Sequence, residues 1–256
     1  MPFALDLENI LTKYIWTFIK FYGEFYLDIF EKIKTLYNLS KNCGYSENEI
    51  NKAEENLGIK FPKILREYYL RLGKNKMVNK SFNRLLNINN EEIGFTNDKN
   101  YLVFYEENQC AAYWGINKND LKNNNPKIYI NYDPNNCADD WFLDSETMET
   151  FLLLMAYWNG ILGGLKYNAN YSNDTGIENK IIRNIENNWN EIKGITNQQL
   201  RFFTNNNTEI IVLTTDLKNN VNGIFIGTNN KNIFFEALEI INIKWDYRSD
   251  EGNYKK

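Results

Sequence analysis

Polar and apolar positions alternate with a helical period through the first part of the chain. Between Asp6 and Asn38, charged and polar side chains recur three, four or seven positions apart, and aromatic and aliphatic side chains fill the other positions. Residues at these spacings share one face of a helix, so the pattern predicts one long amphipathic helix with a wide apolar side. The polar positions are Lys13, Thr17, Lys20, Glu24, Asp28 and Glu31.

This first helix is expected to pack on the core or to mediate self-association. Its aromatic residues, such as Trp16 and Phe21, suggest a membrane interface as the alternative. Spanning a bilayer needs about 20 consecutive apolar residues, and Lys20 and Glu24 interrupt the run. A surface-bound helix favours a basic polar face, whereas this face carries both signs. The pattern therefore predicts no membrane contact.

Two shorter helices follow, and both have terminal signals. Ser46 and Glu49 have the spacing of a capping box, and Leu57-Gly58 suits a left-handed turn at the end of that helix. Pro62 suits the first position of the next helix, which runs from Lys63 to Leu72 before Gly73.

The period then changes to that of strands separated by polar loops. Strand-like runs cover Arg84–Ile88, Tyr101–Tyr105, Cys110–Ile116 and Lys127–Tyr132, and Glu106-Glu107-Asn108-Gln109 has the composition of a hairpin turn. A further helix is expected from Ser145, with Glu146 and Glu149 in its first turn, and Gly160 to Gly164 ends it.

Helix and strand patterns also alternate after a polar stretch that begins at Lys166. The pattern predicts a helix near Ile177–Lys193, a hairpin of Leu200–Thr204 with Glu209–Thr214, a strand at Gly223–Thr228 and a last helix near Ile233–Ile241. The chain is therefore expected to have an α+β fold.

Composition removes many functional classes. The chain of 256 residues has no histidine, and its three cysteines, Cys43, Cys110 and Cys137, are widely spaced. No Ser-His-Asp triad, His-ligated metal or Cys-x-x-Cys zinc site is possible, and no glycine-rich phosphate loop is present. We expect no metal or other cofactor, a reducing cytoplasmic location and no enzymatic activity, although carboxylate chemistry stays open.

Three short strings in the same order resemble the SUKH superfamily, which includes a fungal cell-wall regulator and many bacterial immunity proteins. They are Glu54–Pro62 with the following helix, Val103–Gln109 followed by Trp114-Gly115-Ile116, and the helix from Ser145 to Trp158. The resemblance covers about Leu39 to Leu165. Cys110 departs from it, because a small residue such as glycine is expected after the turn.

The resemblance implies a curved, mainly antiparallel sheet flanked by helices and used to bind other proteins. We expect residues 1–38 to form the long helix packed on the core, residues 39–165 the SUKH-like domain, and residues 166–256 a C-terminal α/β extension. This extension is either separate or part of the same domain. Fold alone does not fix function.

The segment between Ile128 and Leu165 is strongly acidic, because it contains aspartate and glutamate but no lysine or arginine. Acids near a helix N-terminus explain half of this bias; Asp133, Asp139 and Asp140 need another explanation. A calcium loop lacks the required glycine, and sequence cannot show a catalytic pair of carboxylates. We predict a partner-binding acidic rim with aromatic anchors: Glu106, Glu107, Tyr113, Trp114, Asp133, Asp139, Asp140 and Trp141.

The net charge of −4 and the absence of a basic stripe argue against direct nucleic-acid binding. The leading hypothesis is a cytoplasmic immunity protein that binds a basic cognate toxin, such as a nuclease, and occludes its active site. A regulatory scaffold that assembles through its N-terminal helix is the alternative, and a carboxylate-based enzyme is the third.

Overall fold

The structure of the protein is a computed structural model that describes residues 28–90, 92–133, 141–197 and 199–251. The helices of its first half are α2 (Ile29–Tyr37), α3 (Glu47–Leu57), α4 (Lys63–Leu72) and the short α5 (Lys76–Asn79). The strands are β1 (Arg84–Leu85), β2 (Gly94–Phe95), β3 (Tyr101–Glu106), β4 (Tyr113–Asn117), β5 (Ile128–Asn131) and β6 (Phe142–Ser145), with the 3-10 turn Lys118–Asp120 between β4 and β5.

These strands form the first sheet, in the order β1-β3-β4-β5-β6, and β2 also pairs with β3. The described pairings are all antiparallel. Helix α6 (Met148–Asn159) follows β6 and continues into a π-helical turn, Gly160–Gly164. Helix α6 leads the chain out of the first sheet and toward the second.

A second antiparallel sheet contains the remaining strands, in the order β12-β7-β11-β10-β9-β8. Its strands are β7 (Tyr167–Ser172), β8 (Asn190–Glu191), β9 (Leu200–Thr204), β10 (Glu209–Thr215), β11 (Val221–Thr228) and β12 (Tyr247–Arg248). Helix α7 (Asn179–Asn188) precedes β8, helix α8 (Lys231–Ile241) follows β11, and the 3-10 turn Ser249–Glu251 follows β12. The α+β fold class predicted from the sequence is confirmed.

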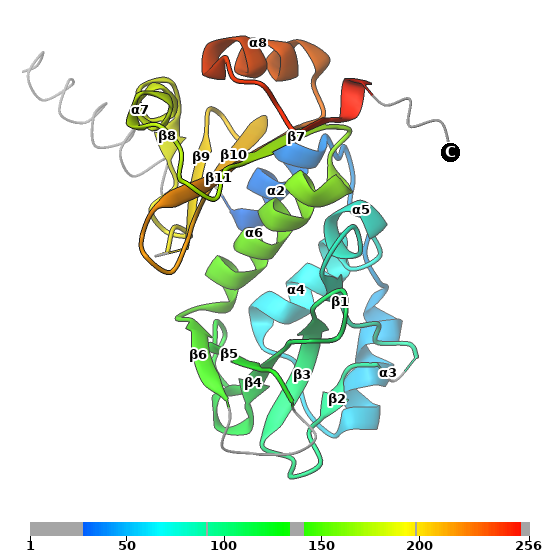
Figure 1. Ribbon diagram of the computed structural model, residues 1–256. Coiled ribbons are helices and arrows are strands. Elements are labelled where there is room, and N and C mark those ends of the chain that lie inside the picture. Colours follow the sequence, from blue (N-terminus) through cyan, green and yellow to red (C-terminus); the bar gives the residue numbers. More distant parts are fainter. Residues whose placement is uncertain (1–27, 91, 134–140, 198, 252–256) are drawn as a thin grey trace, which may run out of the picture.

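Helices α2 and α6 lie between the two sheets (Figure 1). Phe151 of α6 packs on Phe104 of the first sheet with ring centroids 5.5 Å apart. Trp158, two turns later, packs on Phe225 of the second sheet at 5.9 Å. Because one helix packs against both sheets, a single core cluster includes residues of both. The division of the chain at residue 165 stays a prediction.

Strand β10 is buried on both of its faces. Ile210 and Val212 belong to the core shared with α6, and the alternate residues Ile211 and Leu213 belong to the core under α7 and α8. Side chains alternate between the two faces of a strand, so a strand covered on both sides reads as an unbroken apolar run.

The predicted start and end of the second helix are confirmed. The Ser46 hydroxyl accepts a hydrogen bond from the Glu49 amide, and the Glu49 carboxylate accepts from the Ser46 amide at 2.8 Å. Gly58 ends the helix with a φ of 68°, a conformation that glycine adopts without steric cost. Local sequence therefore determines both ends of this helix.

The long N-terminal helix is corrected. Asp28 has φ −42° and ψ 130°, and its side chain caps α2, so a continuous helix from Asp6 to Asn38 is wrong at this residue. The earlier part of that prediction lies outside the described residues. The described helix, Ile29–Tyr37, packs in the core as expected, and Phe30, Ile33 and Leu36 are buried there.

Three further expectations are also corrected. The helix expected from Ser145 begins at Met148 with Thr147 as its cap, because residues 142–145 form β6 and extend the sheet. The polar stretch after Lys166 is the strand Tyr167–Ser172, whose backbone pairs with β11 and β12. Pro62 precedes the next helix as its cap and is not its first residue.

Candidate protein-binding edge of the first sheet

The structure brings several of the predicted partner-binding residues to one end of the first sheet. Glu106 of β3 is the register partner of Tyr113 in β4, and Tyr113 is the partner of Asn131 in β5. Asp133 follows two residues after Asn131 and is exposed. The end of the sheet where β3 finishes and β4 begins therefore carries both acidic and aromatic side chains.

The two glutamates of the β3–β4 turn also have structural roles. The carboxylate of Glu106 forms an ion pair with the Arg84 guanidinium at 2.8 Å. The carboxylate of Glu107 accepts hydrogen bonds from the amides of Gln109, at 2.8 Å, and Ala111, at 3.3 Å. The ion pair offsets the charge of Glu106, whereas the hydrogen bonds of Glu107 hold the turn.

Cys110 occupies the position in this turn where glycine was expected. Its φ is 60°, the left-handed conformation that glycine adopts most easily. The Arg84 guanidinium donates to its sulfur at 3.1 Å. The residue in this turn is therefore a cysteine and not the expected glycine, but its backbone conformation is the one that glycine would adopt.

Trp114 and Trp141 are not exposed anchors, since each is less than a tenth exposed. Trp114 lies on the helix-covered face of the sheet near Phe151, and its indole nitrogen donates to Asp144 at 3.2 Å. Trp141 lies on the opposite face, stacked on Tyr101 with ring centroids 4.2 Å apart. Both tryptophans support the sheet and do not project from it.

Three large apolar side chains that the sequence did not single out are exposed at the neighbouring edge. Tyr132, just after β5, is 65% exposed, and Phe142 and Leu143 of β6 are 59% and 47% exposed. Phe142 and Leu143 are the register partners of Ile130 and Tyr129. The short apolar run Trp141-Phe142-Leu143 is the signal in the sequence that indicates a strand here.

Strand β6 is the edge of the sheet, and within the described part of the chain it pairs with β5 alone. An edge strand presents backbone N–H and C=O groups on its open side. We call Tyr132, Phe142, Leu143 and Asp144 the β5–β6 edge.

The charge around the β5–β6 edge is acidic. Asp144 is exposed and fixed by two donors, the Trp114 indole and the Ser145 hydroxyl, the latter at 2.7 Å. Glu146 pairs with Lys127 at 2.7 Å, which offsets that one carboxylate. The predicted residues Asp139 and Asp140 lie outside the described residues, so their place at the edge stays a prediction.

The titratable groups at this end of the sheet include the phenol of Tyr113. Partial burial, followed by the nearby Cys110 and Glu106, raises the pKa of Tyr113, so its phenol is further from ionising at neutral pH. The described residues contain no group of three or more cysteines and carboxylates able to hold a metal ion. Nor does the described part of the chain contain a helix long and apolar enough to cross a membrane. The arrangement is suited to binding a surface.

Residues 44–154 match the model of the SMI1 / KNR4 family (SUKH-1). This range covers helices α3 to α5, the first sheet and the first half of α6, and it confirms the resemblance to the SUKH superfamily. Comparison with curated proteins and with solved structures gave no significant match.

The structure explains two of the strings that carry this resemblance. The carboxylate of Glu54 is buried, accepts from the Phe61 amide at 3.0 Å and pairs with Lys60 at 2.7 Å, which fixes the turn before Pro62. A Cβ on Gly115 would lie 3.0 Å from the Trp141 ring, so the glycine leaves room for the indole. These motif residues hold the sheet and its helices together.

Proposed function

We propose that this protein binds a partner protein through the β5–β6 edge and that the partner is a cognate toxin. Binding would block the active site of the toxin without turnover and without a cofactor. The family matched by residues 44–154 supports this proposal, because toxin-immunity proteins are among the members of the SUKH superfamily.

The observation that carries the proposal is the group of exposed apolar side chains on an open strand. Tyr132, Phe142 and Leu143 are three of the eight large hydrophobic residues exposed in the described chain, and they belong to, or directly follow, the paired strands β5 and β6. Phe142 and Leu143 are successive residues of β6 and therefore point to opposite faces of the sheet, so apolar side chains are exposed on both sides of this strand. Exposed apolar side chains mark interaction sites, and an open strand edge is a template for an added strand. A partner segment that pairs with β6 would also cover these side chains.

Charge supports a basic partner. The segment from Ile128 to Leu165 contains no lysine or arginine, while Asp133 and Asp144 are exposed next to the apolar side chains. Acidic charge raises the association rate with a basic protein and excludes acidic partners. A nuclease, whose active site attracts nucleic acid, would have that charge. This protein would occupy the site without binding nucleic acid itself, and we expect the complex to form in the cytoplasm.

The proposal is tested by capture of the partner on wild-type protein and on two variants of matched chemistry. The edge variant carries Phe142→Ser and Leu143→Ser. The control carries Leu217→Ser, which also removes an exposed apolar side chain, 93% exposed, but in the loop between β10 and β11. Bound proteins are identified by mass spectrometry, and each purified candidate is assayed for toxic activity with and without this protein.

We expect a basic toxin that the wild type and the Leu217 variant inhibit and that the edge variant inhibits at least tenfold more weakly. Raising the salt concentration should slow association, because screening weakens steering between opposite charges. Equal inhibition by all three proteins would reject the edge as the binding site. If the wild-type protein captures only further copies of itself, and no toxin is inhibited, the regulatory scaffold is favoured instead.

A further inference from the structure

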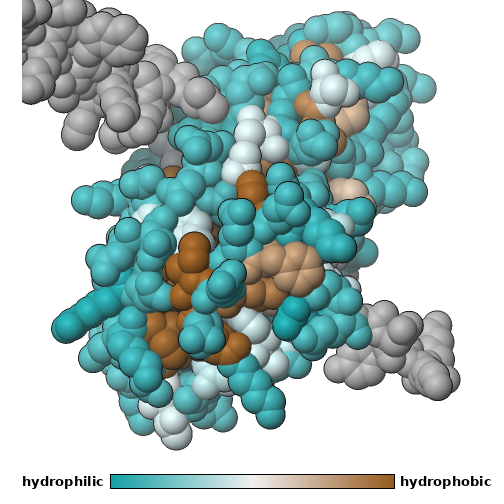
Figure 2. Space-filling view, turned by 90° about the horizontal axis from the view of Figure 1, so that it is seen from above, coloured by the Kyte–Doolittle hydropathy of each residue, from teal (hydrophilic) through white to brown (hydrophobic). Residues whose placement is uncertain are grey.

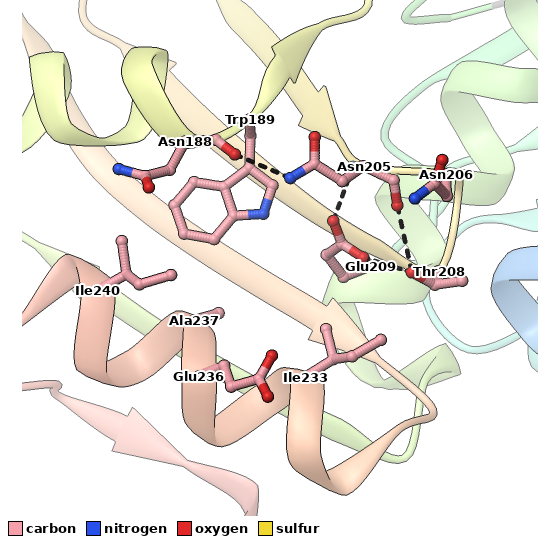
Figure 3. A pocket seen from close by; sticks show the side chains of 10 residues that line it. All are labelled: Asn188, Trp189, Asn205, Asn206, Thr208, Glu209, Ile233, Glu236, Ala237 and Ile240. Atoms are coloured by element: carbon pink, nitrogen blue, oxygen red, sulfur yellow. Dashed lines mark hydrogen bonds between the residues drawn. The ribbon is translucent and has the colours of Figure 1, made fainter.

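A pocket of about 230 Å³ lies in the second sheet's half of the molecule (Figure 3). It is bounded by the end of α7, the turn between β9 and β10, and one side of α8. Its lining residues are Asn188, Trp189, Asn205, Asn206, Thr208, Glu209, Ile233, Glu236, Ala237 and Ile240. The pocket lies outside the range that matches the family model.

Helix α8 has two apolar sides, and the second lines this pocket. Phe234, Leu238 and Ile241 are buried against the sheet. Ile233, Glu236, Ala237 and Ile240 line the pocket, at the spacing of three, one and three residues that places side chains along one face of a helix.

The surface around the pocket is partly apolar. Ile240, which lines the pocket, is 37% exposed, and Ile233, which also lines it, is partly exposed. Figure 2 shows the molecule from the side of α8, where hydrophobic residues gather among hydrophilic ones. A side chain bound in the pocket would therefore cover apolar surface that is partly exposed.

Among the described residues, no basic side chain balances the acidic side chains of the pocket. Glu209 is 3% exposed, and its carboxylate accepts from the Asn205 amide at 2.7 Å, from the Thr208 hydroxyl at 2.6 Å and from the Trp189 side chain. Burial nevertheless raises the pKa of Glu209 above its usual value. No lysine or arginine lines the pocket, and among the described residues neither Glu209 nor Glu236 has an ion pair.

A cation would complete this site chemically. The two carboxylates attract positive charge, and Trp189, which also lines the pocket, has an aromatic ring of the kind that binds cations. Ile233 and Ile240 can contact an aliphatic chain, as the stems of lysine and arginine require. The volume is below the roughly 300–1,000 Å³ of pockets for drug-sized ligands, so it is suited to a single side chain.

We propose that this pocket binds the side chain of an arginine or lysine presented by a partner protein. The guanidinium or ammonium group lies near Glu209 and Glu236, and the aliphatic stem lies along Ile233 and Ile240. A protein side chain is the source because its aliphatic stem would cover Ile233 and Ile240, which an inorganic cation would leave uncovered. This site is separate from the β5–β6 edge, and its test does not depend on a toxin.

The test uses two small probes that differ in charge but hardly in shape, Nα-acetyl-arginine methylamide and Nα-acetyl-citrulline methylamide. Each is titrated into the full chain while NMR records the tryptophan indole N–H signals, and the Trp189 signal is assigned with Trp189→Phe. We expect the Trp189 signal to move with the arginine probe and not with the citrulline probe. Equal shifts with both would overturn the assignment of a cation site.

Two variants on the exposed side of α8 separate the pocket from general surface charge. Glu236→Gln removes a pocket carboxylate, and Glu239→Gln removes an exposed one from the same helix that does not line the pocket. We expect Glu236→Gln to weaken binding of the arginine probe by about fivefold, as loss of a charge pair does, and Glu239→Gln to leave it unchanged. Equal loss in both would reject the pocket. Agmatine, a free cation, is titrated in parallel. If agmatine binds tenfold more tightly than the arginine probe, the proposal that a protein supplies the bound side chain is wrong.

Discussion

The side chain of Asn159, at the end of α6, is the polar centre of the first core, and its replacement by alanine is the sharpest test of how the core is held. This asparagine is fully buried. Its amide nitrogen donates to the carbonyl oxygens of Val78 and Asn83, at 2.8 and 3.0 Å, and contacts the Tyr105 hydroxyl at 3.1 Å. Its amide oxygen accepts from the Asn83 amide at 2.9 Å.

Asn159→Ala would leave these groups buried without partners. A buried donor or acceptor that loses its partner costs about 1–3 kcal/mol, and a water entering the new space would restore part of the loss. The side-chain oxygen of Asn83 already lacks a partner, so the substitution would add to the unpaired polar groups of this region. We expect the free energy of unfolding to fall by about 3–5 kcal/mol, a large part of the roughly 5–15 kcal/mol of a typical domain.

The assay is urea unfolding followed by tryptophan fluorescence, with the slope against urea compared between variants. Asn187→Ala, an exposed change in α7, is the control and should alter stability by no more than about 0.5 kcal/mol. Asn159→Asp has the same size but no amide donors, and should destabilise at least as much as alanine. A loss below about 1 kcal/mol in Asn159→Ala would refute the reasoning, because it would mean that the bonds contribute no more than ordinary exposed ones.

Three other predictions concern an exposed carboxylate, the first sheet and the second sheet, in that order. The Lys74 ammonium, followed by the Ser46 amide, lowers the pKa of Glu49 to about 2, so its stabilising contribution is present above the normal pKa and lost as pH falls toward 2. The Glu49→Gln variant should be less stable than wild type by about 1 kcal/mol at neutral pH after solvent screening, and urea midpoints should converge in acid. Gly115→Val should displace the Trp141 ring, lowering stability by about 1–3 kcal/mol and changing the near-UV circular dichroism; an unchanged spectrum would contradict the close contact. Arg201→Lys should lose the two-pronged contact with the Glu191 carboxylate, costing about 1 kcal/mol by thermal unfolding.

Local signals in the sequence determined the elements that depend on neighbouring residues. The capping box at Ser46, the glycine at the end of that helix and the apolar spacing in α4 each act within a few residues, and the structure has all three. The same holds for the hairpin of β9 and β10, which is closed by a short polar turn. The family resemblance was also present in the sequence, since its strings lie in local turns and strands.

The tertiary structure decided which of these elements are exposed and which residues meet. Residues 142–145 became a strand because β5 offered them a hydrogen-bonding partner, and their position at the edge left Phe142 and Leu143 exposed. Trp114 and Trp141, equally aromatic in the sequence, are buried because α6 covers one face of the sheet and Tyr101 stacks on the other. Burial depends on contacts between residues far apart in the chain, and a local sequence pattern does not show those contacts.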